Sequence, residues 1–183
     1  GLDYLKGQTC HISTEIENNV PTVDPLSNHT IPVGTPFVLT GSASDADASD
    51  NLTYTWEQKD DGTVPSDVFG PTNTQGANFR SLLPSQEPTR YLPLLSSVIS
   101  GNLTLEDPYI GSPWETLSTV PREFTFALTV RDNSVGGGGV AYRDMTVTVV
   151  DNDGDDNKVG AFAVTSQSLG NVYIAGSPRM VTW

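Results

Sequence analysis

The fold is decided by Leu52-Thr53-Tyr54-Thr55-Trp56-Glu57-Gln58 and by Phe124-Thr125-Phe126-Ala127-Leu128-Thr129-Val130-Arg131-Asp132-Asn133. In each stretch large apolar residues occupy every second position, so one face is hydrophobic and the other carries Thr and charged side chains. A period of two is typical of a strand that lies half-buried against a second sheet. The sequence therefore predicts an all-β chain built as a β-sandwich.

Further strands are expected on both sides of these two stretches. Residues 37–43 place Phe37 and Leu39 inward, and residues 140–150 place their apolar residues inward after a glycine-rich hairpin loop. Residues 31–36 carry two prolines, which an edge strand tolerates and a central strand does not. The strand from residue 52 follows an acidic turn, and its Trp56 is expected to fill the core between the sheets.

The order of these segments predicts a divided chain. We expect a connector at 1–19, a sandwich at 20–150 with a long insertion at about 59–121, and an acidic linker at 151–160. The first strands of a second, truncated β-domain are expected at 161–183, as in a piece of a longer protein. Sixty residues without structure are unusual inside a compact domain, so the insertion should hold one or two short strands and a helical turn.

The bulk composition limits the function. Among 183 residues there are 22 acidic and 9 basic side chains, a formal net charge of −13. Binding of phosphate backbones depends on clustered Lys and Arg, so nucleic acid is not expected as a partner. No stretch approaches the length of a membrane span. Cys10 is the only cysteine, so no internal disulfide is possible; we expect a disulfide tether to an upstream domain, with an inert thiol as the alternative.

Several segments together resemble a known family. Residues 41–47, 52–58 and 126–133 resemble polycystic-kidney-disease (PKD)-type and cadherin-like immunoglobulin-fold repeats. Further segments resemble the region downstream of the catalytic domain in bacterial secreted reprolysin-like zinc metallopeptidases; they are residues 78–82, 88–91, 114–117, 162–165, 175–177 and 181–183. The resemblance implies an immunoglobulin-like β-sandwich that is secreted or at the cell surface.

The resemblance does not imply that this chain is itself catalytic. The zinc site of that family needs two His one helical turn apart and a Glu base, as in His-Glu-x-x-His. This chain has only His11 and His29, and neither lies in such a motif. We therefore expect no zinc here and a non-catalytic accessory or spacer module, whose partner is the upstream catalytic domain of the same polypeptide.

Calcium is the cofactor that the acidic residues favour, because hard divalent ions take six to eight oxygen ligands. One candidate group is Asp45, Asp47, Asp50 and Asn51, completed by Asp132 and its neighbour Asn133 from the strand expected alongside. A second group is Asp151, Asp153 and Asp155, with Asn152 and Asp156, which resembles the acidic joints of cadherin-like arrays. The alternative is that these residues are ordinary turn formers and solvated linker charge.

Two other functions remain open from the sequence. Tyr91, Tyr109 and Trp114 in the insertion are candidates for a sugar-stacking platform, or else for a small core of the insertion itself. The first reading predicts an adhesion module that binds an extracellular glycan or matrix protein. Glu57 with Asp60 would offer the two carboxylates of a glycosidase, but nothing in the sequence indicates a raised pKa or a cleft around them.

Overall fold

β-Strands carry the fold in the part of the chain that the computed structural model describes, which comprises residues 7, 16–151, 166, 170, 172–176 and 178–182. One short helix accompanies them there. In chain order the elements are β1 (Thr22–Val23), β2 (His29–Pro32), β3 (Phe37–Thr40), β4 (Ala43–Ser44), β5 (Thr53–Gln58), β6 (Thr89–Leu92), α2 (Leu95–Ser100), β7 (Arg122–Arg131) and β8 (Val140–Val150). The prediction of an all-β chain is confirmed.

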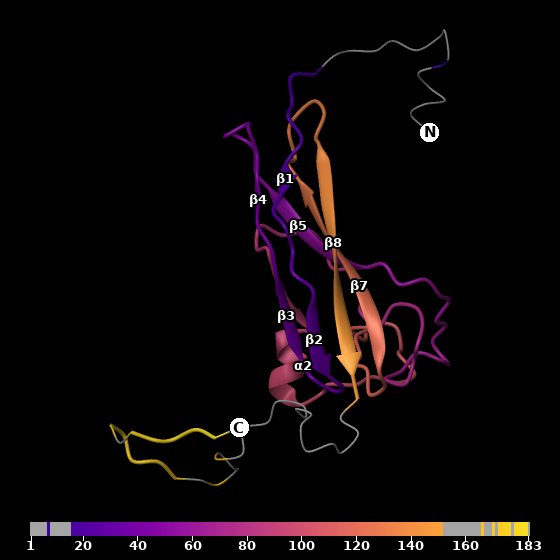
Figure 1. Ribbon diagram of the computed structural model, residues 1–183, viewed down its shortest axis with the longest axis vertical. Helices are drawn as coiled ribbons and strands as arrows, with labels where there is room; N and C mark the ends of the chain where they lie inside the picture. Colours follow the sequence, from indigo (N-terminus) through magenta and orange to yellow (C-terminus); the bar gives the residue numbers. More distant parts are fainter. Residues whose placement is uncertain are drawn as a thin grey trace.

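The largest sheet has four strands in the order β2-β8-β7-β5 (Figure 1). β7 and β8 are long antiparallel neighbours, paired from Arg122↔Val149 to Arg131↔Val140. β5 pairs antiparallel with β7, and β2 pairs parallel with β8 at the opposite edge. Pro32 ends β2, which agrees with the edge position expected from the prolines. The shorter antiparallel pairs β1-β4 and β3-β6 complete the architecture.

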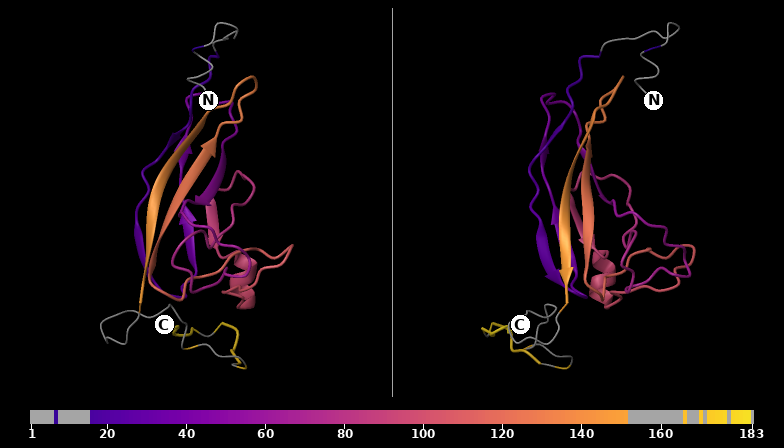
Figure 2. Two further views of the ribbon diagram at one scale, coloured as in Figure 1. Left: turned by 90° about the vertical axis from the view of Figure 1, so that its right-hand side faces the viewer. Right: turned by 45° about the vertical axis from the view of Figure 1, so that its right-hand side comes forward.

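A hydrophobic core lies between the four-stranded sheet and the shorter pairs, so the strands form two layers (Figure 2). The residues expected to face inward do so: Trp56 is 3% exposed and Leu39 is buried, with Phe37 packed against the cluster. The aromatic rings meet edge to face, as between Phe37 and Phe126 at 5.9 Å between centroids. The buried members are Val23, Leu39, Trp56, Phe79, Leu92, Leu117, Phe124, Phe126, Leu128, Val130, Met145, Val147 and Val149.

The insertion at 59–121 contains β6 and α2, so the expected short strand and helical turn are both present. It is also part of the main body. β6 pairs with β3, bringing Leu92 opposite Phe37, and the insertion sends Phe79 and Leu117 into the common core. Its fold therefore depends on the same core as the framing strands.

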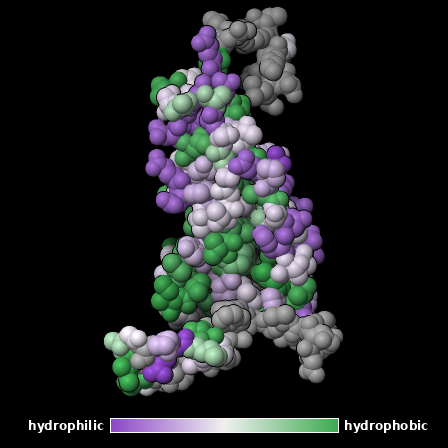
Figure 3. Space-filling view, turned by 60° about the vertical axis from the view of Figure 1, so that its left-hand side comes forward, coloured by the Kyte–Doolittle hydropathy of each residue, from purple (hydrophilic) through white to green (hydrophobic). Residues whose placement is uncertain are grey.

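The two ends of the body differ in character. The loop between β7 and β8 and the turn between β4 and β5 lie at the upper end in Figure 1, whereas the insertion and α2 lie toward the lower end. On the face shown in Figure 3, hydrophilic residues predominate above and hydrophobic residues gather below. The candidate functional features divide between these ends in the same way.

Some expectations fall outside the described residues. Cys10, Asp153 and Asp155 are among them, as are residues 152–165, which were expected to form most of the acidic linker and the start of a second β-domain. Among the described residues, no helix is long and apolar enough to cross a membrane.

Candidate metal centre

The strand pairing brings two acidic loops together at one end of the molecule. β5 and β7 are antiparallel, so Thr53 at the start of β5 lies opposite Arg131 at the end of β7. The turn at 45–52 and the hairpin loop at 132–139 are therefore neighbours, as the sequence predicted for Asp132. These two loops, with residues 16–19 against them, are called the acidic pole below.

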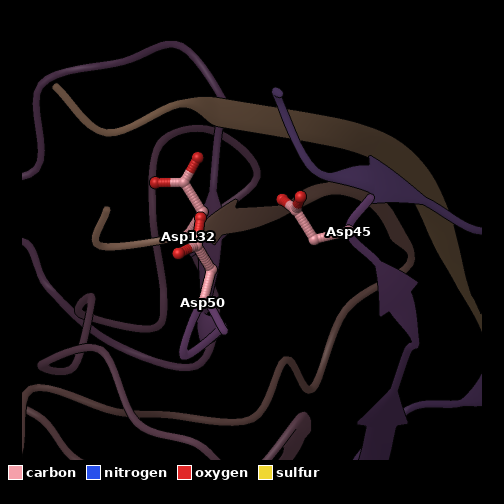
Figure 4. A group of neighbouring side chains, drawn as sticks. All are labelled: Asp45, Asp50 and Asp132. Atoms are coloured by element: carbon pink, nitrogen blue, oxygen red, sulfur yellow. The ribbon is translucent and has the colours of Figure 1, made fainter. Parts of the chain in front are cut away.

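Three carboxylates of the acidic pole converge. Asp45 lies just after β4, Asp50 just before β5, and Asp132 just after β7, and their side chains lie close together (Figure 4). One carboxylate oxygen from each lies within 4.8 Å of the other two. Calcium binds oxygens at 2.3–2.6 Å, so two ligands of one ion are at most about 5 Å apart. The spacing of the three carboxylates fits a single ion.

Asp132 is fully buried and holds the hairpin loop in place. Its Oδ1 accepts from the backbone N–H of Ser134 at 3.0 Å, and both of its oxygens accept from the N–H of Gly139 at 2.9 and 2.8 Å. Its Oδ2 also accepts from Asn18 Nδ2 at 2.8 Å. The Ser134 N–H and then the Asn18 amide hold the pKa of Asp132 below its ordinary value, because they stabilise the charged form. Asp132 is therefore an anion in a fixed position.

Asp45 and Asp50 are less well compensated. The Oδ1 of Asp45 accepts from the N–H of Asp47 at 2.8 Å, as in an ordinary Asx turn. Its Oδ2, and the Oδ2 of Asp50, are buried and have no hydrogen-bond partner within the described chain. Burial, and then the charges of Asp132, Asp47 and Asp45, raise the pKa of Asp50 above its ordinary value. Turn formation alone leaves these two oxygens unexplained.

No Lys or Arg among the described residues neutralises the three carboxylates. The ion pairs among the described residues are Lys59 with Asp144, Arg90 with Glu115 and Arg122 with Asp60, and none includes them. A buried or half-buried carboxylate needs a partner of opposite charge or several hydrogen-bond donors. A hard divalent cation would supply the missing charge and accept the unpartnered oxygens as ligands.

The upstream segment takes part in this arrangement, which the sequence did not reveal. Asn18 donates to Asp132 across 114 residues of sequence, and its own Oδ1 is buried without a described partner. Asn19 donates from its backbone N–H to Asp47 Oδ2 at 2.7 Å. The Asn18-Asn19 pair carries oxygen-ligand chemistry, but sequence reasoning assigned it to a connector, because no local pattern links it to Asp132.

The other described residues that were predicted as metal ligands are not members of the triad. The carboxylate of Asp47 accepts from Asn19. The backbone N–H of Asn19 donates to it, and so does the side-chain amide, which lies 3.2 Å from both carboxylate oxygens. Asn51 is exposed and uses its backbone carbonyl to accept from the Asn133 side chain. Asp151 is exposed and follows β8, whose end lies far from the acidic pole in Figure 1.

The aromatic residues predicted as a platform do not form one surface. Tyr91, in β6, is 42% exposed beside a hollow between β5 and β6, and Tyr109 borders another hollow beside α2. Trp114 lines a third hollow and packs edge-on against Phe69, with ring centroids 5.4 Å apart. The structure therefore places each aromatic side chain at a different depression of the insertion.

The two carboxylates considered for a glycosidase also have structural partners. Glu57 accepts from the Thr129 hydroxyl at 2.7 Å, and Asp60 accepts from the backbone N–H of Thr125 at 2.9 Å. Both therefore fasten β5 and the chain after it to β7.

No protein-family model matches this chain, and a search of curated proteins finds no match.

Proposed function

We propose that this chain is a calcium-stabilised, immunoglobulin-like β-sandwich that acts as a non-catalytic accessory module of a secreted, multidomain protein. The observation that carries the proposal is the convergence of Asp45, Asp50 and Asp132, with one oxygen each within 4.8 Å, while Oδ2 of both Asp45 and Asp50 lacks a partner within the described chain. Calcium would join the β4–β5 turn to the β7–β8 loop.

The proposed ligands come from different parts of the chain, which gives the ion a mechanical role. Asp45 and Asp50 belong to one turn, Asp132 to the strand paired with β5, and Asn18, which donates to Asp132, to the segment that enters the module. An ion held by all of them would fix the path of the entering chain relative to the sandwich. Such an effect suits a module that spaces or docks a preceding domain.

The wider context comes from the sequence resemblance. We propose that the preceding domain is the catalytic domain of a bacterial zinc metallopeptidase, that the protein is secreted, and that the zinc belongs to that domain. A second proposed function is recognition of an extracellular glycan or matrix protein by the insertion. The hollow beside Trp114, of about 600 Å³, supports the protein-binding form of this second function because binding pockets are usually of this size and its lining is mostly apolar.

Thermal unfolding with and without calcium tests the calcium proposal. A ligand that binds only the native state stabilises it by about 2.7 kcal/mol at a hundredfold excess over Kd. For a chain of this length that raises the melting temperature by roughly 5–10 °C. We expect a saturable rise when calcium is titrated into chelator-treated protein.

Two matched variants locate the effect. Asp45→Asn keeps the side-chain size and the Asx turn but removes a ligand charge, so it should abolish or strongly weaken the rise. Asp153→Asn in the linker should leave the rise intact if the acidic pole holds the ion. A rise that survives Asp45→Asn and disappears in Asp153→Asn would assign the calcium to the linker, and no rise in any of the proteins would end the proposal.

A further inference from the structure

Arg80 is an unusual cation in this acidic chain. The other described Lys and Arg side chains each have a partner: Lys59 and Asp144, Arg90 and Glu115, Arg122 and Asp60, Arg131 and Thr55, Arg143 and the Val23 carbonyl, and Arg179 and the Tyr173 ring. No described group accepts a hydrogen bond from the Arg80 guanidinium. Arg80 is exposed, so water solvates its guanidinium and leaves its donors free for a ligand.

The unpaired guanidinium borders an apolar hollow. The hollow has a volume of about 600 Å³ and is lined by Val64, Phe69, Ala77, Ile110 and Trp114 together with Arg80 and two glycines. Arg80 is the only charged side chain in this lining. A mostly apolar hollow with one charged side chain at its border is typical of a site that orients a small ligand group.

The wall of the hollow is held in a strained conformation. Trp114 has a φ of +50°, which is a genuine outlier for a bulky residue. Its carbonyl accepts from the Arg80 N–H at 3.2 Å, and the next residue, Glu115, forms a bridge with Phe79. Glu115 is anchored by its buried ion pair with Arg90 and by the N–H of Leu94 at 2.7 Å. Strain that the surroundings hold in place is a recurring mark of ligand sites.

The same contacts place the backbone of Arg80 beside that of Trp114, and the side chains of both residues line the hollow. The Arg80 N–H is bonded to Trp114, and the Arg80 carbonyl accepts from the Arg90 guanidinium at 2.5 Å. A ligand that uses both groups needs a carboxylate and an apolar group only a few bonds apart. The C-terminal residue of a peptide has both on one Cα atom, whereas the carboxylate of a sugar acid lies on a hydroxylated ring.

From this juxtaposition we infer that the hollow between Arg80 and Trp114 binds the free C-terminus of a peptide that ends in a large apolar residue. The terminal carboxylate pairs with the Arg80 guanidinium, in the forked geometry that arginine offers. The terminal side chain lies among Val64, Phe69 and Trp114. An acidic glycan is disfavoured because the aliphatic lining offers its hydroxyl groups no partners. This site is independent of the calcium proposed at the acidic pole.

Two peptides that differ only in the terminal charge test the inference. The full chain, labelled with ¹⁵N, is titrated with acetyl-Gly-Leu-Phe as the free acid and as the amide, and the backbone amide signal of Ala77 in the lining of the hollow is followed. A charge-assisted hydrogen bond predicts that the free acid binds about tenfold or more tightly than the amide. Arg80→Gln should remove the difference between the two peptides.

Three controls make the result decisive. Arg143→Gln removes a charge from β8 outside the hollow and should leave both affinities unchanged. Trp114→Asn, which suits a positive φ, should weaken both peptides, and Asp45→Asn should affect neither. Equal binding of acid and amide, no binding of either at millimolar concentration, or Arg80-dependent binding of an oligouronate in place of the peptide would each overturn the inference.

Discussion

The acidic pole and the insertion both bury charge, but they compensate it differently. In the insertion Arg90 and Glu115 form an ion pair of 2.8 Å, with side chains 5% and 0% exposed. The guanidinium of Arg122 donates to the carbonyls of Asn73 and Gly76 and to Asn78 Oδ1. At the acidic pole three carboxylates converge without a cation of the protein among the described residues.

This difference indicates which part of the molecule has a stability that depends on calcium and pH. The buried guanidinium groups of Arg90 and Arg122 each have a carboxylate partner in the chain, although the Nε atom of each has no hydrogen-bond acceptor among the described residues. The insertion therefore needs no added ion to balance its buried charge. The carboxylates of the acidic pole repel one another, and desolvation with this repulsion raises the pKa of Asp50. The stability of this end should therefore change with calcium and pH, whereas that of the insertion should not.

The largest expected effect is loss of a buried charge partner in the insertion. Glu115→Ala leaves Arg90 buried without its carboxylate and also removes the acceptor for the Leu94 N–H. Breaking a buried pair from one side costs about 3–5 kcal/mol, because an uncompensated charge remains. We expect a loss of this size in the free energy of unfolding by urea, equal with calcium and with chelator.

An exposed ion pair provides the matched control for this variant. Lys59 and Asp144 lie 2.7 Å apart, but each side chain is 43% exposed. Exposed pairs contribute little, because solvent screens them. Asp144→Ala should leave the free energy of unfolding almost unchanged. A loss as large as that of Glu115→Ala would contradict the distinction between buried and exposed charge.

An effect of intermediate size is expected in hydrogen exchange, which should respond to calcium at the acidic pole and not in the insertion. Calcium should slow hydrogen exchange of the 132–139 loop and the start of β5 by up to about a hundredfold, which corresponds to the 2.7 kcal/mol of binding. Exchange of amides that open only through local motion in β6 and α2 should stay the same. If calcium slowed the exchange of all these amides equally, the ion would stabilise the whole molecule. That result would contradict the distinction between the acidic pole and the insertion.

The smallest expected effect is a difference in melting temperature between Asp50→Asn and the wild-type protein, and its sign should depend on calcium. In chelator, Asp50→Asn removes a carboxylate that is repelled by its neighbours, so the variant should melt slightly above the wild-type protein. In saturating calcium the same variant lacks a ligand and should melt below it. A variant that is less stable in both conditions would show that the Asp50 charge serves the fold without a metal.

The pH dependence follows from the two perturbed carboxyl groups. A raised pKa means that the folded state favours protonated Asp50, so the destabilisation by its charge is complete above that pKa and is lost as the pH falls through it toward the ordinary Asp range. In chelator, the melting temperature of Asp50→Asn should therefore approach that of the wild-type protein over this pH range. Asp132 has a lowered pKa, so its stabilisation is complete above the ordinary Asp range and is lost below about pH 4. Melting curves of both proteins from pH 7 to pH 3 would check the two signs.

Much of the framework could be predicted from the sequence, because a half-buried strand leaves a period of two. The alternation at Tyr54 and Trp56 and at Phe126 and Leu128 indicated β5 and β7, and their antiparallel pairing placed Asp132 beside the acidic turn. The insertion has no such period. Its pairing of β6 with β3 and the Arg90–Glu115 pair depend on contacts between distant residues, as does the bond from Asn18 to Asp132.

A crystal structure of the protein grown with calcium would test the central claim most directly. The account predicts an ion at 2.3–2.6 Å from one oxygen each of Asp45, Asp50 and Asp132, with further oxygen ligands completing six to eight. It also predicts that Asn18 stays against the site. Calcium at millimolar concentration with no ion between these carboxylates, or with an ion bound only by Asp151 and the linker, would contradict it.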